Sequence, residues 1–199
     1  MMNALDGALL VKEARSSMGR FYRNNLEKRK TDKKKLNEKH GLFVTIKDFP
    51  SNRLRGCIGF ISPMPLYEAV QKAAIEAAFH DPRFPPLEKT ELDSVTIELS
   101  IMTEPKPVPN KSLKEIKSEV KIGSDGLLVS NANYSGLLLP QVPVEQDWGV
   151  EEFLEGLCQK ACMPYEFLTD ENTSLWKFQC QIFSELEPNG KVEEIEFNR

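Results

Sequence analysis

The sequence predicts an α+β fold in which a duplicated helix–strand–strand–helix–strand unit surrounds one curved, mainly antiparallel sheet. Residues 3–24 carry apolar side chains at three- and four-residue spacing, which is typical of an amphipathic helix. Residues 95–101 instead alternate between apolar and polar side chains, which indicates a half-buried strand. The third observation is an internal echo, because Gly-Leu-Phe-Val-Thr at 41–45 resembles Gly-Leu-Leu-Val-Ser at 126–130.

The chain of 199 residues is long enough for one domain, 1–199, with two lobes. We expect a first repeat at 1–103, a proline-rich linker at 104–110 and a second repeat at 111–187. The predicted elements are a helix at 3–24, a hairpin within 41–60, a helix ending near Phe79, a strand at 95–101, a short helix opening at Ser112, a hairpin within 120–130, a short strand at 137–142, a helix at 150–162 and a strand at 176–182.

Composition limits the function classes. A net charge of −4 and a pI near 5.4 argue against a strongly basic nucleic-acid binder. The apolar runs are too short to span a bilayer, and the first residues lack the basic region of a signal peptide, so no membrane partner is expected. The four cysteines are widely separated, which favours free thiols in a cytoplasmic protein: Cys57, Cys158, Cys162 and Cys180.

The most charged stretch lies at 27–39, where seven basic and three acidic residues give a local charge of +4. Such runs usually form solvated loops, and this is the favoured interpretation. The alternative is contact with phosphate or with an acidic protein, in which case Lys33, Lys34 and Lys35 would bind an RNA backbone.

The run Leu-Arg-Gly-Cys-Ile-Gly at 54–59 is the most informative segment. In a regular strand, Arg55, Cys57 and Gly59 would share one face, whereas Leu54 and Ile58 would face the core. The first face then has little bulk and a fixed positive charge, and Gly56 adds to this unusual composition for a strand. We therefore expect a concave binding or catalytic spot here.

Cys57 is the candidate nucleophile, because a neighbouring guanidinium favours the thiolate. The alternative is a small buried residue that only fills space. A nucleophilic cysteine usually needs a base, and His80 beside Asp81 is the weak candidate, although a histidine at a helix end is also favoured by the helix dipole alone. With the other thiols less favourably placed, we expect Cys57 to be the most reactive of the four.

Asp81 and Arg83 lie in a stiff proline-rich loop that can present side chains to a ligand. Arg55 and Arg83 together can bind a carboxylate or phosphate, or Arg83 can simply tie the loop down. Gln141 and Glu145 follow a strand of the second repeat and can line a shared cleft.

The chain shows no cofactor signature. Its glycines do not match a dinucleotide or P-loop spacing, so no cofactor is expected. Cys158 and Cys162 lie four residues apart on a helix without a second ligand pair, so no metal site is expected either.

The run at 54–59 matches the complete signature of the AMMECR domain family, and the chain resembles this family over most of residues 5–186. The resemblance continues through Asp-Pro-Arg-Phe-Pro-Pro-Leu at 81–87, Leu-Pro-Gln-Val at 139–142, Glu-Gln-Asp-Trp at 145–148 and Lys-Ala at 160–161. One departure is Cys162, where the family usually has glycine. The resemblance implies a fold and a site at 54–59, and it leaves the reaction open.

The favoured function is that of an enzyme in a nucleobase or small-molecule modification pathway, with its pocket at residues 54–59. The resemblance supports a pathway, because similar proteins often occur with a radical-SAM protein and a dioxygenase-like partner. The ligand would be a small anion or a nucleobase. The alternatives are a non-catalytic ligand-binding or RNA-binding module, or an adaptor for a protein partner.

Overall fold

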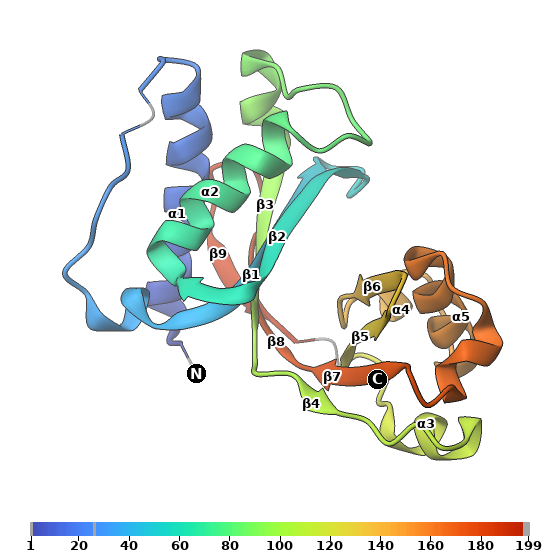
Figure 1. The fold of residues 1–199 in the computed structure, drawn as a ribbon. Helices are drawn as coiled ribbons and strands as arrows, with labels where there is room; N and C mark the ends of the chain where they lie inside the picture. The colour runs from blue at the N-terminus through green and yellow to red at the C-terminus, as the bar shows by residue number, and fades with distance from the viewer. Residues whose placement is uncertain (1, 26, 197–199) are drawn as a thin grey trace. The chain divides into compact units, whose positions relative to one another are not determined.

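The computed structural model describes residues 2–25 and 27–196, which form two compact units (Figure 1). The first unit contains the chain up to Met102 together with Gln181–Ile195, and the second contains Thr103–Cys180 with Glu196. The chain therefore leaves the first unit after Met102 and returns to it after Cys180. Within the described residues, no helix is long and apolar enough to cross a membrane.

The first unit is built on a five-stranded sheet with the strand order β2-β1-β3-β8-β9. β1 pairs antiparallel with both β2 and β3, and β8 pairs antiparallel with β9. The elements are α1 (Ala4–Phe21), the 3-10 turn η1 (Lys34–Asn37), β1 (Lys39–Asp48), β2 (Leu54–Pro65), α2 (Leu66–Phe79), the 3-10 turn η2 (Lys89–Ser94), β3 (Val95–Met102), β8 (Cys180–Glu185) and β9 (Val192–Ile195).

Helices α1 and α2 cover one face of this sheet (Figure 1). Alternate residues of β1, Leu42, Val44 and Ile46, face the helices and are fully buried, as a two-residue period requires. The chain enters α1 through Asn3, whose side chain accepts a hydrogen bond from the amide of Asp6 at 2.9 Å. The predicted helix and hairpin of the first repeat are thus present.

The second unit is built on a four-stranded sheet with the order β4-β7-β5-β6. Helix α5 packs on it through Phe153, Leu154 and Leu157, which are buried with Leu127 and Val129 of β5. The elements are β4 (Lys106–Pro107), α3 (Leu113–Glu119), β5 (Gly126–Asn131), β6 (Tyr134–Leu138), α4 (Val142–Glu145), α5 (Val150–Ala161), the 3-10 turn η3 (Tyr165–Thr169) and β7 (Ser174–Phe178).

The α+β class with antiparallel sheets is confirmed, but the strands form two sheets rather than the one curved sheet that we expected. The segment predicted as one strand at 176–182 is interrupted at Gln179. The amide of Gln179 donates to the hydroxyl of Thr103 at 2.9 Å, and its carbonyl accepts from the amide of Thr103 at 2.8 Å. These two bonds replace the ladder at this position, so β7 ends in one sheet and β8 begins in the other.

The first unit contains the order α1-β1-β2-α2-β3, and the second contains α3-β5-β6-α5-β7 with the short helix α4 inserted before α5. In both sheets the first hairpin strand is central, giving β2-β1-β3 and β6-β5-β7. Gly56 and Gly136 also have similar surroundings, since a Cβ on Gly56 would lie 2.2 Å from the carbonyl oxygen of Ala77, and one on Gly136 would lie 2.8 Å from Ala161. The duplication and its boundaries at 1–103 and 111–187 stay predictions that this likeness supports.

We predict that Gly56→Ala destabilises the protein by about 1–3 kcal/mol, because the new methyl group meets a helix carbonyl that cannot move aside alone. Gly19→Ala in α1 is the matched control, since nothing lies within 4 Å of a Cβ there. That substitution should stabilise the helix by roughly 0.5–1 kcal/mol. Urea unfolding of both variants measures the difference, and equal effects would contradict the packing described here.

Candidate functional site around Cys57

Arg55 occupies a bulge in β2. Ile46 of β1 pairs with Gly56, whereas the next residue, Lys47, pairs with Leu54, so Arg55 has no direct partner in the ladder. The bulge breaks the simple alternation that we expected along residues 54–59. In particular, the expectation that Leu54 faces the core is wrong, because Leu54 is 41% exposed.

The Arg55 guanidinium is committed to the segment that follows α2. It donates to both carboxylate oxygens of Glu91, at 2.8 and 3.0 Å, and to the carbonyl oxygen of Pro85 at 3.0 Å. Arg55 is only 9% exposed. Its charge is therefore balanced by Glu91, and its main effect in this structure is to hold residues 85–91 against β2.

Asp81 and Arg83 cap the outer edge of β2 at Cys57. The amide of Cys57 donates to the Asp81 carboxylate at 2.9 Å, and the carbonyl of Cys57 accepts from the Arg83 guanidinium at 3.1 Å. β2 is an edge strand, and edge strands present unpaired backbone groups. Two side chains thus supply the donor and the acceptor that a neighbouring strand would have supplied.

The Asp81 carboxylate also accepts from the Arg83 side chain at 2.7 and 2.9 Å and from the Arg83 amide at 3.1 Å. Asp81 is only 4% exposed. Burial alone would raise its pKa, but the hydrogen bonds from Arg83 and from the Cys57 amide outweigh burial and lower the pKa to about 2. Asp81 is therefore an anion that the fold requires, and not a free group awaiting a ligand.

The thiol of Cys57 lies in a row of polar residues across three strands. Thr45 of β1 is the direct cross-strand partner of both Cys57 in β2 and Glu98 in β3. The Thr45 hydroxyl donates to the Cys57 sulfur at 3.3 Å. Glu98 forms an ion pair with Lys47 at 3.1 Å. Neighbouring strands of one sheet thus carry a thiol, a hydroxyl and a carboxylate–ammonium pair side by side.

Burial raises the pKa of the Cys57 thiol above its ordinary value. The hydrogen bond from Thr45 and the charge of Arg83 lower it, and the charge of Glu98 raises it. The cation that acts on the thiol is therefore Arg83, and the expectation that Arg55 holds Cys57 as a thiolate is corrected. A raised pKa favours the protonated thiol over the thiolate near neutral pH.

His80 is not placed as a base for Cys57 by any contact of the described residues. It ends α2, its ring pairs with Glu76 at 3.2 Å, and it meets the ring of Phe21 edge-on at 6.3 Å. Its side chain is about half exposed (52%). These contacts match the alternative that we gave for it, a polar residue at a helix terminus.

The two glycines of the motif have packing reasons. Gly56 allows β2 to approach Ala77, as described above. A Cβ on Gly59 would lie 2.4 Å from the carbonyl oxygen of Leu42 and 2.4 Å from the ring of Phe43. The surface beside Gly59 is thus filled by Phe43, and it is not the hollow that the lack of bulk suggested.

Gln141 and Glu145 belong to the second unit, where Gln141 precedes the short helix α4 and Glu145 is its last residue. The amide of Glu145 donates to the carbonyl of Gln141 at 2.9 Å. Gln141 is buried, at 3% exposed, and Glu145 is exposed. A cleft shared with residues 54–59 stays a prediction.

All four cysteines are free thiols. Cys158 is buried and Cys162 is exposed, although both lie at the end of α5. In the part of the chain that the structure describes, no cluster of three or more histidine, cysteine or acidic side chains is arranged to hold a metal ion.

Comparison with known proteins identifies the family. The family model described as AMMECR1 matches residues 11–183. The chain belongs to the AMMECR1 family. It is 49% identical to Protein MJ0810 of Methanocaldococcus jannaschii over 158 residues, 79% of each chain. It is 43% identical to Protein PH0010 of Pyrococcus horikoshii over 192 residues, 94% of this chain and 93% of the other. The crystal structure of that protein, titled uncharacterized, matches with a TM-score of 0.92 at 41% identity over 98% of each chain.

Sequence reasoning missed Thr45, Lys47 and Glu98. The polar residues of 95–101 were interpreted as the solvent side of a half-buried strand, yet all eight residues of β3 are buried. The available signal was their alternation, together with the hairpin that brings Thr45 opposite Cys57. In this AMMECR1 chain, Cys57 of the signature motif is thus one member of a polar row that also contains Thr45 and Glu98.

Cys162, the residue that departs from the family pattern, ends α5 in the left-handed conformation, with φ 54° and ψ 33°. Glycine adopts this conformation without strain, whereas a residue with a Cβ does not. The backbone therefore explains why the family usually has glycine at this position.

Cys162→Gly should stabilise the protein by about 1 kcal/mol, because it removes the Cβ from a left-handed residue. Cys162→Ala retains the Cβ and should leave this strain in place. The difference between the two midpoints of urea unfolding is the measurement. If Cys162→Ala stabilises as much as Cys162→Gly, loss of the thiol and not relief of the backbone is the cause.

Asp81→Asn should destabilise the protein by roughly 2 kcal/mol at pH 7, which follows from a pKa lowered from 3.8 to about 2. Because the folded-state pKa is below the unfolded value, the carboxylate stabilises the fold above about pH 4 and this contribution is lost as the pH falls towards 2. The stability difference between wild type and Asp81→Asn should therefore shrink across that range. Parallel stability curves for the two proteins would contradict the account.

Proposed function

We propose that this AMMECR1-family chain is an enzyme in which the thiol of Cys57 adds to an electron-poor carbon of a C=C or C=N bond in a small substrate. The S–H bond breaks, the C–S bond forms, and the π electron pair moves onto the neighbouring substrate atom. The observation that carries the proposal is the polar row across three strands, with Cys57, Thr45 and Glu98 in direct cross-strand register. The proposal refers to the first unit alone. The substrate class that we infer is a nucleobase or another small polar molecule.

The energetics of burial support a functional row. Thr45 and Glu98 are 5% and 4% exposed, and Ser100, two residues further along β3, is 0% exposed. Removing polar and charged groups from water has a desolvation cost, which the hydrogen bond of Thr45 and the Lys47–Glu98 ion pair offset only in part. A sheet that only had to be stable would carry apolar side chains at these positions. Such local conflict with stability is typical of functional sites.

The row can divide the work of a nucleophilic attack. Because burial keeps the Cys57 thiol protonated at rest, a base must remove its proton when the carbon–sulfur bond forms. Glu98 is the carboxylate of the row and lies on the far side of Thr45 from Cys57, so we assign to it the role of accepting that proton through one bridging water. Thr45 donates to the sulfur and so stabilises the developing thiolate. Lys47 balances the charge of Glu98.

The test uses opposite effects of one substitution. Glu98→Gln removes a negative charge that raises the pKa of Cys57. At a fixed pH near 8 a lower pKa gives more thiolate, so iodoacetamide should alkylate Cys57 faster, by up to about tenfold for each unit by which the pKa falls. The same variant lacks the base, so enzymatic adduct formation at Cys57 should be lost. Arg83→Met, which removes a charge that lowers this pKa, should slow alkylation. Cys180, also half-buried, is the reference thiol in the same samples.

Adduct formation is measured by intact mass and peptide mapping after incubation with a low-molecular-weight cell extract. The Cys162→Gly background removes the exposed thiol, so that its reaction does not mask that of Cys57. We expect a mass adduct on Cys57 that is absent in Cys57→Ser and in Glu98→Gln. An adduct that persists in Glu98→Gln would overturn the role of the base. If no adduct forms, and if Glu98→Gln and Arg83→Met do not change the rate at which Cys57 is alkylated, the proposal of an enzyme is overturned and a binding module is favoured.

A further inference from the structure

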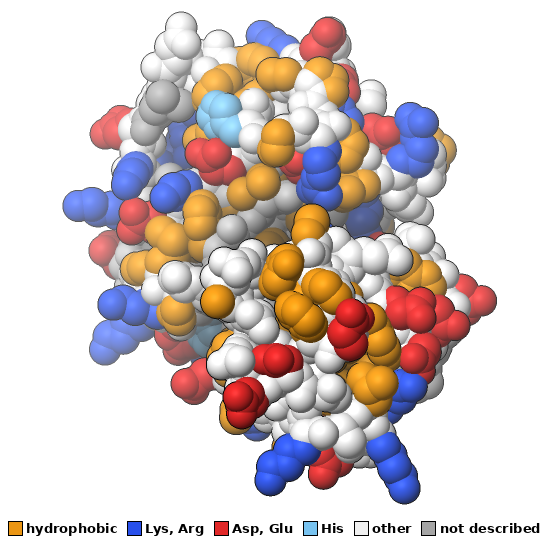
Figure 2. Space-filling view, turned by 45° about the vertical axis from the view of Figure 1, so that its right-hand side comes forward, with side chains coloured by type: hydrophobic (Ala, Val, Ile, Leu, Met, Phe, Trp, Pro, Cys, Tyr) orange, Lys and Arg blue, Asp and Glu red, His pale blue; other side chains and the backbone are white. Residues whose placement is uncertain are grey.

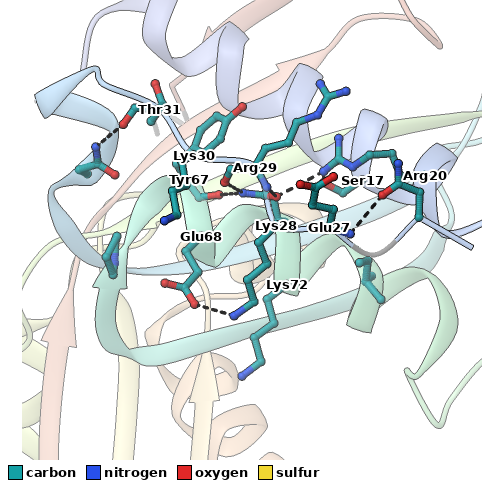
Figure 3. Close-up of a pocket in the computed structure, with 15 residues that line it drawn as sticks. Ser17, Arg20, Glu27, Lys28, Arg29, Lys30, Thr31, Tyr67, Glu68 and Lys72 are labelled. Carbon is teal, nitrogen blue, oxygen red and sulfur yellow. Dashed lines mark hydrogen bonds and ion pairs between the residues drawn. The ribbon is translucent and has the colours of Figure 1, made fainter.

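A cavity of about 580 Å³ lies in the first unit between α1, α2 and the segment 27–31, which we call the strap (Figure 3). This volume is within the range of small-molecule sites in proteins. The cavity is lined by residues of all three segments, including Arg20 of α1, Tyr67 of α2 and Arg29 of the strap. Its lining includes neither Cys57 nor its partners in the polar row.

The lining has an excess of positive charge. Arg20 is already balanced, because it forms a buried ion pair with Glu13 at 2.7 Å. The other charged lining residues are four cations and two carboxylates, namely Lys28, Arg29, Lys30 and Lys72 against Glu27 and Glu68. A phosphate monoester carries a charge of about −1.5 to −2 near pH 7, so it would neutralise this surplus of two positive charges.

The strap is held over α2 through the backbone of Arg29. The side chain of Gln71 accepts from the Arg29 amide at 2.9 Å and donates to the Arg29 carbonyl at 2.9 Å. Gln71 is 7% exposed, and it also accepts from Arg20 at 3.3 Å. Gln71 therefore holds the centre of the strap in place before any ligand binds. Less binding free energy is then needed to order the site.

The cationic side chains at the mouth are easily redirected to a ligand. Lys28 pairs with Glu68 at 3.1 Å, but the two side chains are 76% and 46% exposed, so this pair contributes little to stability. The Lys72 ammonium lies 4.7 Å from the centre of the Phe60 ring. Figure 3 shows the Lys28 and Lys72 side chains extending towards the same side of α2.

The cavity also offers an apolar wall for the body of a ligand. Tyr67, Pro65 and Ile75 contribute to its lining. The Tyr67 hydroxyl donates to Glu13 at 3.0 Å, which fixes the position of the ring. An aromatic ring held in place beside cations is suited to a planar organic group that carries a phosphate.

We propose that this cavity binds an organic phosphate monoester of the size of a nucleoside monophosphate. The inference goes beyond the function proposed for Cys57 and does not depend on it. It also changes the interpretation of the charged stretch, because Lys28, Arg29 and Lys30 line a cavity, whereas Lys33, Lys34 and Lys35 do not. Figure 2 shows both basic and acidic side chains on the face that it presents. The chain carries a net charge of −4, which favours a small ligand over a long RNA backbone.

The experiment is calorimetric titration of the full chain with AMP, GMP, UMP and CMP at low salt. Inorganic phosphate tests the phosphate group without an organic body, and a single-stranded RNA of twelve nucleotides tests the macromolecule. The double variant Lys30→Met with Lys72→Met removes two cavity cations. The double variant Lys34→Met with Lys35→Met removes the same charge outside the cavity.

We expect at least one nucleoside monophosphate to bind more tightly than inorganic phosphate and to lose about tenfold or more in affinity in the cavity variant. The variant outside the cavity should change the affinity less than about twofold, and Cys57→Ser should bind like wild type. No binding below about 1 mM by any of the four nucleotides would overturn the proposal. Equal losses in the two lysine variants, or binding of RNA alone, would also overturn it.

Discussion

The carboxylate of Asp81 is the group on which the rest of the site depends. It accepts hydrogen bonds from the Cys57 amide and from Arg83, and it lies at the outer edge of the first sheet. Without it, the edge strand β2 would present an unpaired amide at Cys57, two residues from the bulge at Arg55. Fixing β2 fixes its register, and the register places Cys57 opposite Thr45. The proposed chemistry of the thiol therefore rests on a structural ion pair.

Much of the fold follows from local sequence patterns. The apolar spacing of residues 3–24 predicts α1, and the paired patterns at 41–60 predict the hairpin of β1 and β2. Two features depend on residues far away in the chain and could not be predicted in this way. At the bulge, the Arg55 guanidinium binds Glu91 and Pro85, which lie 36 and 30 positions away. At the division into two sheets, Gln179 binds Thr103, which lies 76 positions away.

The candidate site could be predicted only in part, because it too depends on residues that are far apart in the chain. The motif at 54–59 identified Cys57, but Thr45 and Glu98 are ordinary strand residues until the register of three strands is known. The charged stretch at 27–39 was expected to be a solvated loop. The stretch is largely exposed, as expected, but three of its cations also line a cavity, because Gln71 of α2 binds the strap backbone, a contact between residues 42 positions apart. Charge patterns show which residues are polar, and only tertiary contacts show what they enclose.

The most direct test of the central claim is the titration of Cys57 itself, followed by the ¹³Cβ chemical shift of cysteine-labelled protein. The account predicts a pKa above that of an ordinary thiol, because burial outweighs the hydrogen bond from Thr45 and the charge of Arg83. In Thr45→Val, which removes that hydrogen bond, the pKa should rise further. A pKa at or below the ordinary value, unchanged in Thr45→Val, would contradict the claim that Cys57 is a protonated nucleophile positioned in this polar row.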